Sequence, residues 1–190
     1  MSWTRLITLT LLFLASGVKG AQEGHKGDAS MVYETLGLLQ ESVGQGNSYI
    51  IREADLNAFL KAEVSRQAPP AIKALTVELG EGLFTTKLSV DMDALNLSGQ
   101  GTTAALLGSL LSGVQELVVV GAVAAKQGKG GYSTHEAALN GVTLPATLVD
   151  LLLSTIGQRL KPPFDPTEPF RLPNGIQSIE IFKGRLELTN

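Results

Sequence analysis

One histidine lies in the part of the chain that is expected to fold, and it is the first residue to test for hydrolytic chemistry. His135 is followed by Glu136, whereas His25 lies in a polar lead-in. A hydrolytic triad needs a nucleophile and an orienting acid around a histidine. Adjacent residues of a strand point to opposite faces, and the sequence has no G-x-S-x-G nucleophile elbow. We interpret His135 as an exposed strand residue, predict no catalytic residue, and rank a hydrolase third among the hypotheses.

Two other patterns resemble ligand sites but lack what those sites need. Asp91-Met92-Asp93 begins like a calcium loop, but Asn96 and Thr102 occupy the positions that require Gly and Glu. The segment 99–104 matches G-x-G-x-x-A, which binds a dinucleotide only inside a parallel β-α-β unit. The chain has no cysteine and no pair of histidines at zinc-site spacing. We therefore predict no metal ion and no cofactor.

The composition narrows the possible classes further. The 190 residues are 44% hydrophobic, 17% charged and 5% aromatic, with a net charge of −3. The length allows one domain, or two small ones. An acidic chain with few aromatic residues is a poor nucleic-acid binder, so that class is excluded. The absence of cysteine excludes disulfides and a cysteine nucleophile.

The first twenty residues are typical of a secretory signal peptide. Arg5 precedes an apolar run, Leu6–Ala15, and small residues follow in Ser16–Gly20. This run is too short to span a bilayer, and no later apolar run reaches the length of about 18 residues that a span needs. We expect a mature chain that begins at Ala21. Because exported proteins without disulfides are typical of a bacterial periplasm, we predict that location.

Hydrophobic periodicity divides the remainder into a lead-in with a helix, residues 21–47, and a single α+β domain, residues 48–190. Period-3.6 patterns predict helices, and period-two patterns predict strands. The expected helices are 30–43, 53–66 and 145–160, with an island at 104–111. The expected strands are 49–51, 75–79, 84–92, 117–125, 132–140, 176–182 and 185–189.

The helix expected at 145–160 is the most apolar element. Its apolar side chains cover an arc of roughly 200°, about twice the stripe that a surface helix needs. The element must therefore be covered on more than one side. A proline-rich strap, Lys161–Pro173, follows it and should run extended, pinned by Phe164 and Phe170.

Long strands beside such a helix would leave an elongated seam of aliphatic side chains. Strands of about ten residues span ~33 Å, and the helix spans ~24 Å. The seam would suit an acyl or prenyl chain, whose burial contributes about 0.8 kcal/mol per methylene. A dry, filled core would produce the same pattern, and the sequence leaves both alternatives open.

Three segments carry a resemblance to a known family. They are Ile51–Leu60, of the type I-x-E-x-x-L-N-x-x-L, the N-G-V-x-L-P turn at Asn140–Pro145, and the segment Pro169–Leu186. Together they resemble small bacterial exported proteins similar to the tubular lipid-binding (TULIP-like) superfamily. The resemblance implies a long curved antiparallel sheet wrapped around the leucine-rich helix, an apolar groove for a lipid, and no catalysis. Arg52 departs from it, because such sequences often carry a Ser or Thr helix cap there.

The sequence thus predicts an exported, non-enzymatic binder or carrier of a lipid or other apolar molecule. Membrane contact would be transient, because the chain lacks a basic cluster. The alternative is a periplasmic protein-protein interaction module with a closed core, which would use a sheet edge or the proline-rich strap. The expected ligand-binding residues are Leu148, Leu151, Leu152 and Ile156 of the helix, then Leu56, Phe59, Leu60, Phe84, Leu88, Val119 and Val123.

Overall fold

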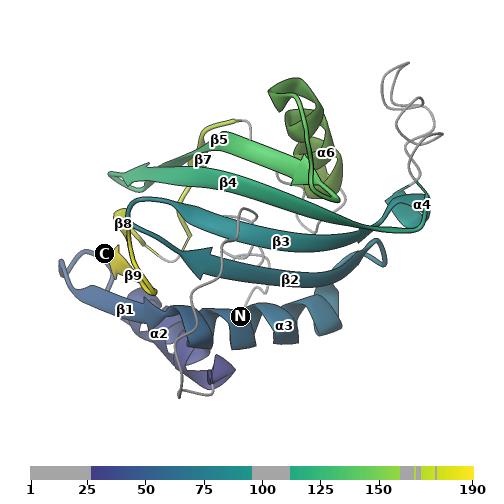
Figure 1. Ribbon diagram of the computed structural model, residues 1–190. Helices are drawn as coiled ribbons and strands as arrows, with labels where there is room; N and C mark the ends of the chain where they lie inside the picture. The colour runs from purple at the N-terminus through teal and green to yellow at the C-terminus, as the bar shows by residue number, and fades with distance from the viewer. Residues whose placement is uncertain (1–26, 96–111, 159–164, 166–167, 174) are drawn as a thin grey trace.

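A curled antiparallel sheet and four helices make up the part of the chain that the structure describes (Figure 1). The structure is a computed structural model, and it describes residues 27–95, 112–158, 165, 168–173 and 175–190. The described helices are α2 (Ala29–Glu41), α3 (Glu53–Gln67), α4 (Met92–Leu95) and α6 (Ala146–Gln158). The strands are β1 (Ser48–Arg52), β2 (Ile72–Leu79), β3 (Phe84–Asp91), β4 (Val114–Lys126), β5 (Lys129–Leu139), β6 (Val142–Thr143), β7 (Phe170–Arg171), β8 (Ser178–Phe182) and β9 (Arg185–Thr189).

The sheet follows the path β1-β9-β8-β4-β3-β2, and β5 pairs with the other side of β4. All pairings are antiparallel. β4 joins the two halves, because it pairs with β3 from Val114 to Gly121 and then with β8 at Ala125. The sheet therefore turns from one set of strands to the other along a single strand, and it curls into a half-barrel.

A β-bulge accentuates the curl. The register between β4 and β5 shifts between Val120 and Gly121. A bulge bends its strand and increases the local twist. Gly121 permits the close approach, since a Cβ there would lie 2.8 Å from the carbonyl oxygen of Ser133. The bulge thus gives the two longest strands the curvature that brings their inner faces toward the helices.

Two tight turns with positive φ angles lie at opposite ends of β5, and the one at Asn140-Gly141 is a turn that the sequence predicts. Gln127 and Gly128 connect β4 to β5 with φ values of 55° and 72°, and Asn140 and Gly141 follow β5 with 50° and 80°. Two consecutive residues with positive φ match the twist of antiparallel strands, and Asn and Gly tolerate this conformation best. The turns fix the register of the long hairpin.

The outer edge of β2 is covered by side chains of α3 instead of another strand. The Asn57 amide Nδ2 donates to the Val77 carbonyl at 2.6 Å, and the Val77 N–H donates to Asn57 Oδ1 at 2.7 Å. The Leu79 N–H donates to Glu53 Oε2 at 2.7 Å, and its carbonyl accepts from the Gly184 N–H at 2.9 Å. Unpaired edges invite association with other chains, so these bonds both hold α3 in place and protect β2.

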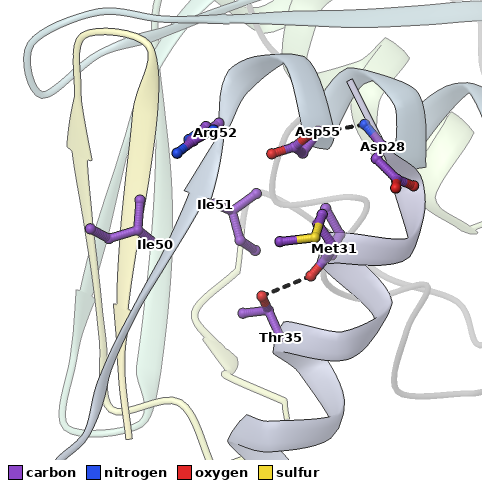
Figure 2. A pocket seen from close by; sticks show the side chains of 8 residues that line it. Asp28, Met31, Thr35, Ile50, Ile51, Arg52 and Asp55 are labelled. Carbon is purple, nitrogen blue, oxygen red and sulfur yellow. Dashed lines mark hydrogen bonds between the residues drawn. The ribbon is translucent and has the colours of Figure 1, made fainter. Parts of the chain in front are cut away.

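The helix α2 packs on α3, and two contacts in its N-terminal half connect it to opposite ends of α3. At one end, the Asp28 side chain caps α2 through the Ser30 N–H, and the Asp28 N–H donates to Asp55 Oδ1 at 2.9 Å (Figure 2). Farther along, the Tyr33 hydroxyl donates to the buried Glu63 carboxylate, which Arg66 Nη1 also contacts at 3.1 Å. Burial, and then the Glu63 carboxylate, raises the pKa of Tyr33.

The C-terminal end of α2 rests on a buried asparagine. Asn190 Nδ2 donates to the Ser42 carbonyl at 2.8 Å and to Ser42 Oγ at 2.6 Å. Its Oδ1 accepts from the Asn47 N–H at 2.9 Å. One side chain at the end of β9 therefore satisfies polar groups of α2 and of the turn that leads into β1.

The main sequence expectations are confirmed within the described residues. The fold is α+β with an antiparallel sheet, and the expected long helices and strands are found with shifts of a few residues at their ends. The helix α3 begins at Glu53 without a side-chain cap from Arg52, and the Glu53 N–H donates to the Gly184 carbonyl instead. The predicted signal peptide, the helical island 104–111, the pattern 99–104 and Phe164 lie outside the described residues.

Removing the Asn57 amide should destabilise the fold. The Asn57→Ala variant leaves the N–H and carbonyl of Val77, a residue only 3% exposed, without their partners. We expect a loss of about 2 kcal/mol in the free energy of unfolding, measured by urea denaturation. Thr76→Ala, at the exposed neighbouring position of β2, is the control and should change stability little. Equal stability of Asn57→Ala and wild type would contradict this role.

Candidate ligand-binding site

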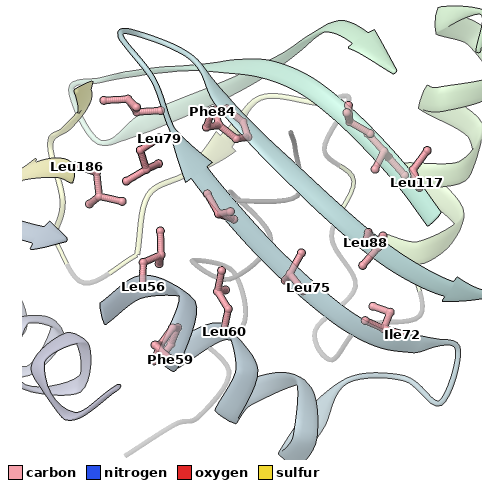
Figure 3. Packing of buried hydrophobic residues seen from close by; sticks show 14 of the residues in the cluster. Leu56, Phe59, Leu60, Ile72, Leu75, Leu79, Phe84, Leu88, Leu117 and Leu186 are labelled. Atoms are coloured by element: carbon pink, nitrogen blue, oxygen red, sulfur yellow. The ribbon is translucent and has the colours of Figure 1, made fainter. Parts of the chain in front are cut away.

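At the α3 end, the concave face of the sheet is closed by tightly packed apolar side chains (Figure 3). Leu56, Phe59 and Leu60 of α3 are no more than 1% exposed. Phe84 and Leu88 of β3 are equally buried, and β2 contributes neighbouring apolar residues to the same cluster. The structure thus brings together the expected residues of α3 and β3, but it brings them together as core.

The far half of β4 and β5 presents less completely covered apolar side chains on the same face. The register pairs Leu88 with Leu117 and Thr86 with Val119, which places the odd-numbered residues of β4 on the concave side. Val119 is 2% exposed, whereas Val123 and Ala125 are only partly buried. The apolar surface on the concave side therefore continues beyond the sealed core.

The helix α6 lies beside β5 and contributes both buried and partly exposed leucines. Val149, Leu152 and Leu153 are no more than 2% exposed and belong to the core. Leu148 and Leu151 are partly buried, and the side chain of Ile156 lies outside the described part. The leucine-rich helix is therefore covered on one side by the core while two of its expected ligand-binding residues keep exposed surface.

One tyrosine supplies a polar group among these apolar side chains. Tyr132 of β5 faces Val123 across the pair of strands, and its ring lies 6.0 Å from that of Phe84. Its hydroxyl accepts from Thr134 Oγ1 at 3.2 Å. Burial raises the pKa of Tyr132 to about 12, and the Asp150 charge on α6 acts in the same direction. The helix α6, which carries Asp150, packs against β5.

The last residues of the proline-rich strap close the outer edge of β5. Phe170 and Arg171 form β7, which pairs with Gly130 and Lys129. A Cβ on Gly130 would lie 2.3 Å from Phe170 Cε2, so the Phe170 ring occupies the space that a side chain would fill. The expected pinning of the strap by Phe170 is thereby confirmed.

The His, Asp and Glu side chains that the sequence analysis considered lie at separate places in the described residues. They contain no group of three or more His, Cys, Asp or Glu side chains that could hold a metal ion. His135 and Glu136 are exposed on β5 at the bulge. Asp91 and Asp93 are engaged locally, because Asp91 pairs with Lys73 at 3.1 Å and Asp93 Oδ2 accepts from the Gly113 N–H at 3.0 Å. What the concave side offers is apolar surface, with a phenol and a threonine hydroxyl.

A separate pocket of about 480 Å³ lies between α2, β1 and the start of α3. Met31, Val32 and Ile51 give it an apolar lining, and charged residues stand at the α3 end; the full lining is Asp28, Met31, Val32, Thr35, Ile50, Ile51, Arg52 and Asp55. The sequence analysis missed this pocket. A signal was present in α2, where Met31 and Leu38 lie seven residues apart, beside the buried stripe of the helix, and are 50% and 44% exposed.

Comparisons with known proteins give no assignment. No family model matches the chain, and no curated protein resembles it significantly. Within the described ranges, every helix is too short or too polar to cross a membrane.

The phenol of Tyr132 should be the last tyrosine to ionise. The folded protein holds it neutral to about pH 12, whereas the unfolded chain releases its proton near pH 10.0. Its contribution to stability is therefore complete below pH 10 and is lost as the pH rises toward 12. Alkaline titration of tyrosinate absorbance should show this late component, and Tyr132→Phe should remove it. Its persistence in Tyr132→Phe would refute the assignment.

Proposed function

We propose that this protein is an exported, non-enzymatic binder or carrier of a lipid or other apolar molecule, held between α6 and the concave side of the curled sheet. In this proposal the sheet wraps around the leucine-rich helix and a ligand occupies part of the space between them. The residues of contact are Leu148 and Leu151 of α6, with Val123 and Tyr132 of the strands.

The observation that carries the proposal is the contrast between the two ends of the concave face. Around α3, the apolar side chains are sealed from solvent. Val123 continues the same apolar face of the sheet and is only partly buried. Leu148 and Leu151 of α6, the helix beside β5, also keep exposed surface. Apolar pockets with few polar groups are typical of lipid and small-molecule sites, and burying each methylene there contributes about 0.8 kcal/mol.

The polar groups near this surface favour a ligand with a long hydrocarbon part and a small polar end. Tyr132 and Thr134 supply hydroxyl groups, and the nearest charge, Asp150, is acidic. The chain as a whole carries a net charge of −3. A strongly anionic headgroup would be disfavoured here, and contact with an anionic membrane would be transient.

Recovery of the natural ligand is the direct experiment. The protein would be purified from its own envelope and examined by native mass spectrometry, followed by organic extraction. A bound species that moves into the organic phase supports the carrier. A stable complex with another protein and no extractable lipid supports an interaction module with a closed core instead.

A charge placed on α6 should abolish binding of an apolar probe. Leu151→Asp buries part of a carboxylate among apolar side chains, so we expect affinity for a fluorescent long-chain fatty alcohol to fall by at least about tenfold. Leu38→Asp places the same charge at an exposed position of α2 and should bind as wild type does. Thermal unfolding of both variants establishes whether they remain folded. If Leu151→Asp does not fold, the milder Leu148→Gln variant replaces it in the binding assay. Equal affinity in all variants would overturn the proposed site.

A further inference from the structure

The strand β1 has one edge that the described chain leaves uncovered. Its other edge pairs with β9, where the Asn190 N–H donates to the Asn47 carbonyl and the Glu53 N–H donates to the Gly184 carbonyl. Hydrogen-bonded pairs alternate in antiparallel strands. Tyr49 and Ile51 therefore turn their backbone groups toward β9, and Ile50 turns its N–H and carbonyl away from β9. No other described strand pairs with the outward N–H and carbonyl of Ile50.

This open edge differs from the other edges of the sheet. At β2, the outward backbone groups of Val77 and Leu79 are satisfied by Asn57, Glu53 and Gly184. At β5, the two short strands β6 and β7 pair with the two ends of the outer edge, at Ala138–Leu139 and at Lys129–Gly130. Because exposed edges promote unwanted association, proteins usually cover them. An edge that is left open beside a pocket is suited to receive a strand from outside.

The pocket of about 480 Å³ runs along this edge. Figure 2 shows Ile51 and Met31 on the α2 side of β1 and Ile50 on its opposite side. Ile50 is 58% exposed and Met31 is 50% exposed. An extended segment between β1 and α2 could pair with Ile50 while its alternate side chains enter the apolar pocket or cover Ile50.

The charge at the end of β1 favours a carboxylate opposite Arg52, while Glu187, the cross-strand partner of Ile50, supplies a negative charge farther along the same face. Arg52 and Arg185 are cross-strand partners, so their side chains share one face at the end of β1. Directly opposed like charges are destabilising. Arg185 stacks on the Phe182 ring at 4.8 Å, and Arg52 is exposed at the pocket rim without a side-chain cap on α3. The two acids of the lining, Asp28 and Asp55, are engaged at the ends of α2 and α3.

We propose that β1 is a docking site for an extended segment of a partner protein, which adds to the sheet as an antiparallel strand and carries one carboxylate at the Arg52 end. The partner residue opposite Arg52 carries a carboxylate, the next one enters the pocket over Ile51, and the third is an apolar residue that pairs with Ile50. α2 forms the opposite wall of the pocket, so the space suits one strand rather than a second copy with its own flanking helix. This inference is independent of the proposed lipid site.

A backbone substitution tests strand addition directly. Proline is tolerated at an edge position whose N–H faces outward, so Ile50→Pro removes the donor without breaking the pairing with β9. The probe is a short fluorescein-labelled peptide with the central sequence Asp-Val-Val, followed by anisotropy. We expect Ile50→Pro to bind about tenfold more weakly than Ile50→Thr, which retains the N–H. In wild type, the Ile50 amide should become protected from hydrogen exchange when the peptide binds.

A charge exchange tests the predicted specificity. Wild type should bind a peptide with Lys-Val-Val more weakly than the peptide with Asp-Val-Val. The Arg52→Glu variant should show the reverse preference. Equal binding of both peptides, or equal binding by Ile50→Pro and Ile50→Thr, would overturn the proposal. A dimer in light scattering that Ile50→Pro dissociates would assign the edge to a second copy and would likewise overturn it. Leu151→Asp should leave peptide binding unchanged, which separates this site from the lipid site.

Discussion

Two side chains of α3, Glu53 and Asn57, take the place that a neighbouring strand would otherwise occupy beside β2. They satisfy backbone groups of Val77 and Leu79 that point away from β3. Leaving such groups buried without partners costs about 1–3 kcal/mol each. The same bonds fix the position of α3, whose apolar side then packs on the concave face. These bonds of Glu53 and Asn57 therefore help to seal this end of the half-barrel. They also help to place α2, because α2 packs on α3.

The two ends of the concave face differ in exposure. Apolar side chains around α3 are sealed from solvent, whereas those in the far half of β4 are partly exposed. Phe59 and Phe84 fill the space around α3, whereas the far half of β4 carries the smaller side chains of Val123 and Ala125, beside Tyr132 and Gly130 of β5. Large aromatic residues bury more area than small aliphatic ones. The far half of β4 therefore buries less area, and its partly exposed Val123 is one basis of the proposed carrier function.

The edges of the sheet show a similar division. β2 is covered by helix side chains, β5 is paired at its two ends with short strands, and β1 keeps outward backbone groups beside a pocket. Edge protection requires specific residues at specific places, and Arg52 stands at the open edge where a capping residue would have served α3. The proposed apolar-ligand site and the proposed docking edge thus lie on different elements, so a partner and a ligand could be bound at the same time.

Much of this architecture follows from the sequence alone, because it depends on local patterns. The alternation in β2 and β3, the apolar stripe of α3 and the Asn140-Gly141 turn each specify their own backbone. The sequence could not determine which apolar residues become core. Leu56 and Leu151 have the same side chain, yet one is sealed and the other is not, because burial depends on how the curl of β4 and β5 places distant elements. The partners of Asn57 and the open edge beside Ile50 were likewise decided by tertiary structure, since each depends on which segments lie next to one another in space.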